Sequence, residues 1–150
     1  MSLLSPRWLL AALLAVPVVA QAAPEYLNSG KVLPTTLPFS EAVRVGDTVY
    51  LSGQIGNLPG GLTLASGGIE GESRQVMENI KTSLEAHGLS LDDVVKCTVM
   101  MADIGEWAAF NDVYKGYFKP GRFPARSAFG ASGLAFDARV EVECIAATTR

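Results

Sequence analysis

Residues 74–101, RQVMENIKTSLEAHGLSLDDVVKCTVMM, contain a change of pattern that decides the fold class. In the first half, apolar side chains recur at four-residue spacing, at Val76, Ile80 and Leu84. This spacing predicts an amphipathic helix over residues 70–87, with Gly88 in a position where helices commonly stop. The second half, Val94 to Met101, is rich in β-branched and apolar residues and predicts a central strand. A helix followed closely by a strand indicates a mixed α and β architecture.

The flanking segments extend this alternation. Their patterns predict a hairpin at 43–55 that turns at Gly46-Asp47, a second helix at 103–118, and strands at 127–130 and 139–147. The glycine-rich loop at 56–68, with a short ribbon at 62–64, is a candidate flap over a site. The order β-β-α-β-α-β-β predicts an α+β fold with two helices packed on one face of a mixed sheet. The other face is then uncovered, which favours association with further copies of the chain.

Residues 1–22 have the pattern of a secretory signal peptide. Arg7 supplies a positive charge, WLLAALLAVPVVA is apolar, and Ala20-Gln21-Ala22 resembles a cleavage site. The apolar stretch is shorter than the about 20 residues that a membrane-spanning helix needs. We therefore expect one mature domain, residues 23–150, that is periplasmic or secreted and has no stable membrane association. The alternatives are an uncleaved membrane anchor, or a misassigned start and a cytoplasmic protein.

The composition excludes several classes of function. The chain has a formal charge of −3 and no cluster of lysine and arginine, which argues against non-specific binding of nucleic acid. A single histidine, His87, excludes a multi-histidine metal site. Two cysteines, Cys97 and Cys144, are too few for a disulfide framework. Because both lie in predicted strands, we expect buried thiols, with a disulfide as the alternative if the strands are neighbours in an oxidising compartment.

A solitary arginine, Arg126, is the first candidate functional residue. Between it and Asp137 lie ten residues without an ionisable side chain, so no carboxylate near in sequence can pair with it. A planar guanidinium group can bind a carboxylate through two parallel hydrogen bonds. Arg126 is therefore either a binding group for an anionic ligand, or a solvated or inter-subunit salt-bridging residue.

Two carboxylates, Glu141 and Glu143, lie on one face of the last predicted strand. Such a pair is commonly the solvated edge of a sheet. Ile145 continues the same face with an apolar side chain, however, and a carboxylate beside apolar surface can have a raised pKa and transfer a proton. Ser52 and Asn111 are further polar candidates, although these residue types are also common in turns and on helix surfaces.

Four segments together resemble the RidA/YjgF family. They are SGQI at 52–55, the helix and strand at 74–101, FNDVYKGYF at 110–118, and PARSAFGASGLAFDARVEVECIA at 124–146. The similarity extends from about Asn28 to Thr149. It implies a chorismate-mutase-like α+β fold that forms a homotrimer with sites in the clefts between subunits. It also implies hydrolysis of reactive enamines and imines, such as 2-aminoacrylate, to 2-keto acids and ammonia without a metal or an organic cofactor.

The resemblance also implies roles for individual residues. Arg126 has the position of the arginine that binds the substrate carboxylate. Glu141, rather than Glu143, has the position of the carboxylate that orients the attacking water. Ser52 and Asn111 match further positions in the cleft.

The sequence departs from the family pattern at several positions of this cleft. Phe39 stands where the family usually has tyrosine, and Ala128 stands where RidA members often have cysteine. Gly130, Ala131 and Gly133 replace larger residues, which predicts a roomier or more mobile site. These departures leave open a non-catalytic trimer that binds small carboxylates. The ribonuclease activity attributed to some relatives fits poorly with the acidic net charge.

Overall fold

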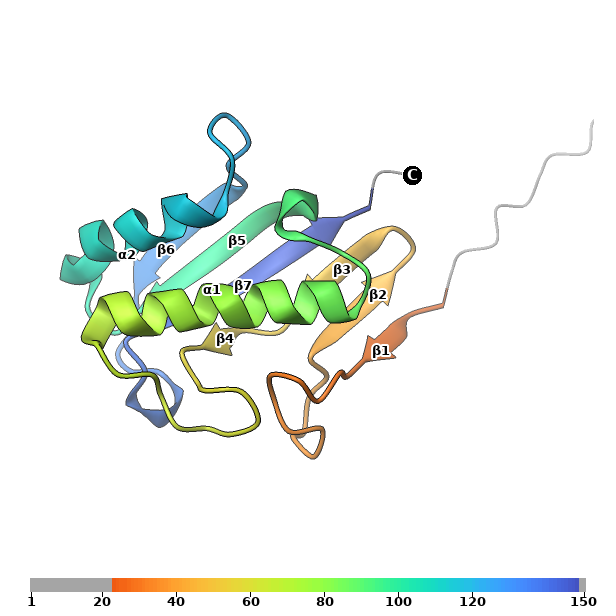
Figure 1. Cartoon of the computed structure of the whole chain (residues 1–150), viewed down its shortest axis with the longest axis horizontal. Coiled ribbons are helices and arrows are strands. Elements are labelled where there is room, and N and C mark those ends of the chain that lie inside the picture. Colours follow the sequence, from red (N-terminus) through yellow and green to blue (C-terminus); the bar gives the residue numbers. More distant parts are fainter. Residues whose placement is uncertain (1–22, 149–150) are drawn as a thin grey trace, which may run out of the picture.

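The computed structural model describes residues 23–148, which form one mixed sheet with two α-helices packed against it (Figure 1). The sheet has seven strands in the order β1-β2-β3-β7-β5-β6, and β4 pairs with β7 beside this path. The strands are β1 Glu25–Leu27, β2 Ala42–Val45, β3 Thr48–Leu51, β4 Gln54–Ile55, β5 Val94–Met101, β6 Ala125–Gly130 and β7 Val140–Ala147. The helices are α1 Gly68–Ala86 and α2 Trp107–Tyr114, with 3₁₀ turns at Leu91–Asp93, Ile104–Glu106, Lys115–Tyr117 and Ala135–Asp137.

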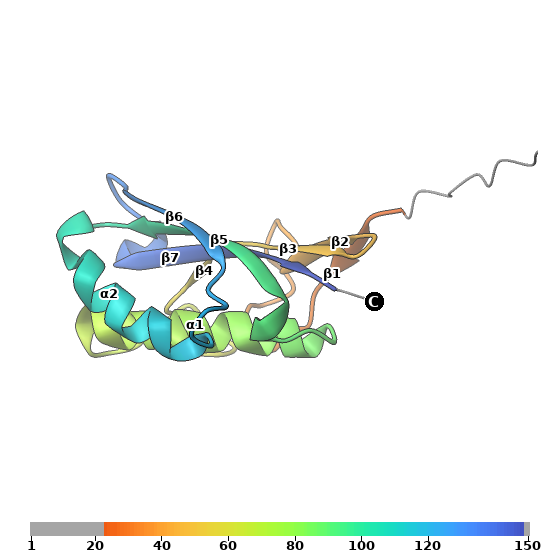
Figure 2. The ribbon, with the colours of Figure 1, turned by 90° about the horizontal axis from the view of Figure 1, so that it is seen from above.

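Both helices cover the same face of the sheet, as the view from above shows (Figure 2). The side chains predicted for the apolar face of α1 are buried, because Val76, Ile80 and Leu84 are at most 1% exposed. They pack on the alternate residues of β5 and β7 that face the helices, in one apolar core. The predicted α+β architecture with two helices on one face is therefore confirmed.

The central strands β5 and β7 are antiparallel neighbours joined by a disulfide bond between Cys97 and Cys144. The two residues lie directly opposite each other, with their Cα atoms 4.1 Å apart, and both are buried. The expectation of two free thiols is therefore wrong, and the alternative of a disulfide between neighbouring strands is correct. The spacing of the cysteines alone does not reveal which strands are neighbours, because their pairing depends on the order of strands in the sheet.

Three local features differ from the sequence prediction. β6 begins at Ala125, so Arg126 lies within an edge strand and not in the loop that precedes it. The short strand β1 pairs with β2 and has no strong apolar pattern that would predict it. The ribbon expected at 62–64 is reduced to a single bridge between Asn57 and Leu64.

The second face of the sheet has no helix over it in the described part of the chain (Figure 2). Tyr50 and Phe129 project from this face, and each is 49% exposed. Exposed aromatic side chains on an open sheet favour association with another protein surface.

Within residues 23–148, no helix is long and apolar enough to cross a membrane. The predicted signal peptide, residues 1–22, lies outside the described residues.

Candidate active site

Arg126 projects from the edge strand β6 toward the helices. It is paired in register with Cys97 of β5, and Cys97 is in turn paired with Cys144 of β7. Residues in such a row share one face of the sheet, and here it is the face that the helices cover. The guanidinium group consequently reaches α2, where it donates a hydrogen bond of 2.6 Å to Oδ1 of Asn111. The structure thus brings together two of the residues predicted for the site.

Aromatic rings surround the same guanidinium group. Its central carbon lies 4.6 Å from the ring centroid of Tyr114, 5.7 Å from that of Phe110 and 5.9 Å from that of Trp107. These distances permit cation–π attraction, which holds the arginine without neutralising its charge. The sequence predicts the helix at 103–118 that carries the three rings, but not their contact with Arg126. Burial raises the pKa of the Tyr114 phenol, and the positive charge of Arg126 partly offsets this effect.

Arg126 has no acidic partner in the part of the chain that the structure describes, since no carboxylate lies within ion-pair distance of it. Beside the guanidinium group is an open cavity of about 310 Å³. Its lining consists of Asn111, Tyr114, Lys115, Phe123, Pro124 and Arg126. The arginine therefore remains available to a carboxylate ligand. We refer to Arg126 and Asn111 as the basic half-site.

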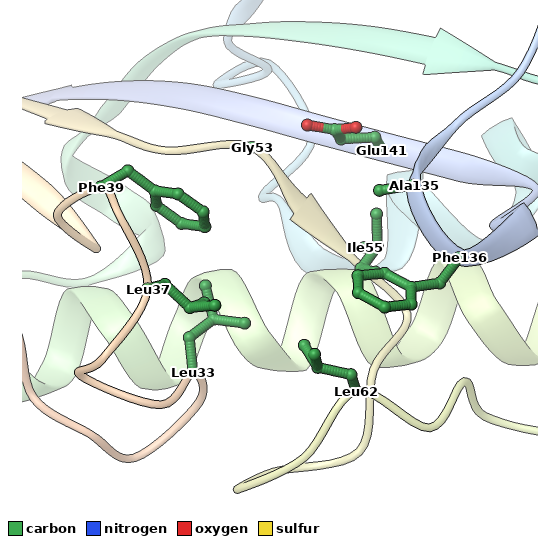
Figure 3. Close-up of a pocket in the computed structure, with 9 residues that line it drawn as sticks. All are labelled: Leu33, Leu37, Phe39, Gly53, Ile55, Leu62, Ala135, Phe136 and Glu141. Atoms are coloured by element: carbon green, nitrogen blue, oxygen red, sulfur yellow. The ribbon is translucent and has the colours of Figure 1, made fainter.

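Glu141 lies on the opposite face of the sheet. On β7 the buried residues Val140 and Val142 face the helices, so Glu141 between them faces away from the helices. Its carboxylate borders a second cavity, of about 190 Å³, whose lining is mostly apolar (Figure 3). The lining residues are Leu33, Leu37, Phe39, Gly53, Ile55, Leu62, Ala135, Phe136 and Glu141.

The carboxylate of Glu141 occupies the space beside Gly53, where any other residue would place its side chain. A Cβ atom added to Gly53 would lie only 2.0 Å from Oε1 of Glu141, a distance that real structures do not show. Only glycine fits at this position while Glu141 keeps its place. No pattern in the sequence indicates this role of Gly53, although the residue lies inside the SGQI segment at 52–55. We refer to Glu141 with Gly53 and Phe39 as the acidic half-site.

The environment of Glu141 favours its protonated form relative to an exposed glutamate. Partial burial raises the pKa of Glu141 above its ordinary value, and the neighbouring charge of Glu143 raises it further. A raised pKa makes the carboxylate a stronger proton acceptor, and the carboxyl group can then return the proton. The structure therefore agrees better with a carboxylate at the margin of apolar surface than with a carboxylate on a solvated sheet edge.

The basic and acidic half-sites do not meet within one chain. Arg126 points to the face of the sheet that the helices cover, and Glu141 points to the other face. Strand β5 lies between their strands, and neighbouring strands are about 4.8 Å apart. A small ligand cannot contact both side chains of the same chain, because the sheet itself separates them.

Comparison with known proteins assigns the fold to a family. The family model described as Endoribonuclease L-PSP matches residues 30–148. This is the RidA/YjgF family, and the chain belongs to it.

Relatives in this family include proteins named 2-iminobutanoate/2-iminopropanoate deaminase. The human protein of that name is 43% identical over 109 residues, which cover 73% of this chain and 79% of the human protein. The protein of that name from the mite Dermatophagoides farinae is 40% identical over 124 residues, covering 82% and 96% of the two chains.

Solved structures of RidA/YjgF proteins have the same fold. RidA from Psychrobacter sp. PAMC 21119 superimposes with a TM-score of 0.77 at 36% identity, covering 83% of this chain and 99% of that one. TdcF from E. coli, solved with bound serine, superimposes with a TM-score of 0.76 at 29% identity, with the same coverage.

The remaining residues that the RidA/YjgF resemblance singles out lie in different surroundings. The Ser52 hydroxyl donates a hydrogen bond of 2.7 Å to the carbonyl oxygen of Ser40, and thus holds the loop that carries Phe39. Phe39 itself lines the cavity next to Glu141 and is 49% exposed. Ala128 lies on β6 in the same row as Val99, two positions after Arg126, and lines neither cavity. Among residues 23–148, no group of histidine, cysteine and acidic side chains is arranged to hold a metal ion.

Proposed function

We propose that this protein hydrolyses 2-imino acids, and the enamines in equilibrium with them, to 2-keto acids and ammonia. Two independent observations support the proposal. Relatives that are 40–46% identical are named 2-iminobutanoate/2-iminopropanoate deaminase. In addition, Arg126 lies beside an open cavity and has no acidic partner among residues 23–148, as binding of a substrate carboxylate requires.

The complete site forms between subunits of a homotrimer. We place the site between subunits because the two half-sites lie on opposite faces of one sheet. One subunit supplies Arg126 and Asn111, and its neighbour supplies Glu141, Gly53 and Phe39. The uncovered face of the sheet, with its exposed aromatic side chains, is the surface available for this association.

Each half-site has its own part in the reaction. Arg126 binds the carboxylate of the imino acid through its planar fork and thereby fixes the position of the neighbouring imine carbon. Glu141 orients a water molecule and accepts its proton as the oxygen attacks that carbon. The same carboxyl group returns the proton to nitrogen, which gives a carbinolamine. A second proton then passes from the new hydroxyl group to the nitrogen, the C–N bond breaks as the C=O double bond forms, and ammonia leaves. One water molecule is consumed for each ammonia released, so atoms and charge balance.

A turnover assay tests this proposal. The mature protein is mixed with 2-imino acids generated by an amino-acid oxidase, and release of keto acid is compared with release in buffer. Arg126→Ala is expected to lower kcat/KM by about a hundredfold or more, because a charged hydrogen-bonding partner of the substrate is lost. The matched control is Arg74→Ala, since Arg74 is an exposed arginine paired with Glu70 on α1. Release no faster than in buffer would overturn the proposal.

A second candidate function is binding of small carboxylates without turnover. The structure of the relative TdcF with bound serine favours it, since serine carries a carboxylate. Stabilisation of the protein by 2-keto acids in a thermal-shift assay, together with no acceleration of imine hydrolysis, would support this alternative.

We also propose that the mature protein works in the periplasm or outside the cell. Its supports are the signal-peptide pattern of residues 1–22 and the disulfide between Cys97 and Cys144, because disulfides persist in oxidising compartments. Fractionation of cells followed by sequencing of the mature N-terminus tests it. A full-length chain in the cytoplasm would contradict it.

A further inference from the structure

The cavity beside Glu141 is more apolar than hydrolysis of a small imino acid requires. Seven of the nine residues around it have apolar side chains, and the other two are Gly53 and Glu141 itself. The apolar side chains come from separate segments of the chain, namely the 33–39 loop, β4, the 56–68 loop and the 135–137 turn (Figure 3). Glu141 is the only side chain of the lining that can take part in proton transfer.

The two aromatic residues of the lining are not part of the core. Phe39 is 49% exposed and Phe136 is 58% exposed, although both are large and apolar. Figure 3 shows their rings on either side of the cavity, with Leu33, Leu37 and Leu62 along one side of it. A concave, exposed apolar surface of this kind is typical of small-molecule binding sites.

The turn that carries Phe136 has an unusual backbone conformation. Its φ angle is 59°, and that of Asp137 is 57°, which is a region that residues other than glycine rarely adopt. The turn is fixed where it enters β7, because the backbone amide of Arg139 donates a hydrogen bond of 2.8 Å to Glu72, and Ala138 is buried. Strain of this kind persists where the surrounding structure enforces it, and it is concentrated at functional sites.

From this geometry we infer that the cavity is the specificity pocket for a large apolar substrate side chain, such as that of a branched-chain or aromatic 2-imino acid. The inference rests on the proposed function. The imine carbon must lie next to Glu141 at the rim of the cavity, while the substrate carboxylate points to Arg126 of the neighbouring subunit. The third substituent of that carbon is the substrate side chain, and it then enters the cavity.

The size of the cavity fits this assignment. An apolar cavity of about 150 Å³ is large enough to hold benzene. The cavity beside Glu141 measures about 190 Å³, which is enough for a leucine or phenylalanine side chain. The methyl group of an alanine-derived imine would leave most of it empty.

A series of substrates tests the inference. We would measure kcat/KM for the imino acids that an amino-acid oxidase forms from leucine, phenylalanine and alanine. The kcat/KM for the imino acid formed from leucine or phenylalanine is expected to exceed that for the imino acid formed from alanine by at least about tenfold. The reason is that each carbon buried in an apolar pocket contributes to discrimination. Phe136→Ala and Leu37→Ala are expected to reduce this ratio at least about fivefold by the same reasoning. The matched control Leu58→Ala should leave the ratio unchanged, because Leu58 is also largely exposed but does not line the cavity.

The outcomes separate this inference from the proposed function. If no imino acid reacts faster than in buffer, the proposed function fails and the inference fails with it. If the alanine product reacts as fast as the larger ones, and Phe136→Ala does not change the ratio, the proposed function stands and the inference is wrong. This second result is expected if a side chain of the neighbouring subunit fills the cavity, because no room would then remain for the substrate side chain. Binding of 4-methyl-2-oxopentanoate and of pyruvate, compared by calorimetry, is a second readout independent of turnover, and equal affinities would also overturn the inference.

Discussion

Arg126 and Glu141 lie on opposite faces of one β-sheet, with strand β5 between the strands that carry them. The guanidinium group of Arg126 is enclosed by rings of α2, and the carboxylate of Glu141 lies against Gly53 on the uncovered side. A small ligand therefore cannot contact both side chains of one chain. The proposed reaction, which uses both residues, consequently requires at least two copies of the chain.

The contact between Gly53 and Glu141 predicts that Gly53→Ala lowers activity strongly. The new methyl group would lie 2.0 Å from Oε1 of Glu141, so the carboxylate must move. A displacement of about 1 Å in a catalytic group can lower the rate about a hundredfold. Steady-state kinetics should show the loss mainly in kcat. Gly116→Ala is the control, because a Cβ atom at Gly116 meets no atom within 4 Å, and an equal loss there would contradict the explanation.

The charge of Glu143 should affect the pH dependence of the reaction. Burial and the charge of Glu143 both raise the pKa of Glu141, and the proposed reaction needs Glu141 ionised to accept a proton from water. Activity should therefore fall on the acid side at a higher pH than an ordinary glutamate would give. In Glu143→Gln this acid limb of kcat/KM should move to lower pH, because one of the two causes is removed. An acid limb that does not move would contradict an effect of Glu143 on the carboxylate that the proposed reaction uses.

A buried carboxylate that lines neither cavity, that of Glu41, should contribute to the pH dependence of stability. Glu41 accepts hydrogen bonds of 2.7 Å from the amide and the hydroxyl of Ser29, and its other oxygen lies 3.8 Å from Nε2 of His87. Burial acts to raise the pKa of Glu41, but the nearby Ser83 hydroxyl, the hydrogen bonds from Ser29 and the charge of His87 together lower it below its ordinary value. A carboxylate with a lowered pKa stabilises the fold above its ordinary pKa, and this stabilisation is lost as the pH falls through the pKa of the folded state.

Urea unfolding at several pH values measures this effect. Glu41→Gln is expected to lower the free energy of unfolding at pH 7. Its effect should decrease as the pH falls below about 4, because Glu41 is protonated first in the unfolded chain and then in the folded one. Glu85→Gln is the control, since Glu85 is an exposed residue on α1. A loss of the same size at every pH would mean that the charge of Glu41 has no part in the stabilisation.

The disulfide between Cys97 and Cys144 should contribute substantially to stability. It links the central strands across a sequence separation of 47 residues, and a disulfide that closes a loop of this length typically contributes about 2–4 kcal/mol. The variant with both Cys97→Ala and Cys144→Ala should unfold at correspondingly lower urea concentration. Equal stability of this variant and the oxidised protein would show that the crosslink is dispensable.

Much of the fold could be predicted from the sequence because its patterns are local. Val76, Ile80 and Leu84 repeat with the period of a helix, and the run from Val94 to Met101 has the composition of a buried strand. The pairing of Cys97 with Cys144 could not be decided, because it depends on which strands become neighbours. β1 was missed because three mostly exposed residues have no distinctive pattern.

The candidate site was predicted only in part, for a related reason. Arg126 and Glu141 are recognisable as residues, but the sequence does not tell which face of the sheet each of them occupies. That depends on register, which a shift by one residue would reverse. The need for Gly53 arises from a contact between two strands distant in the sequence, and the rings around Arg126 depend on how α2 packs. These are properties of tertiary packing, and no short motif contains them.

Complementation between two inactive variants tests the shared site most directly. Chains with Arg126→Ala and chains with Glu141→Gln, each with a different affinity tag, are co-expressed, and hybrid trimers are isolated through both tags. In a cyclic trimer, every hybrid contains one interface at which an intact Arg126 meets an intact Glu141, so about a third of wild-type activity is expected. Activity no higher than that of the two separate variants would contradict a site shared between subunits.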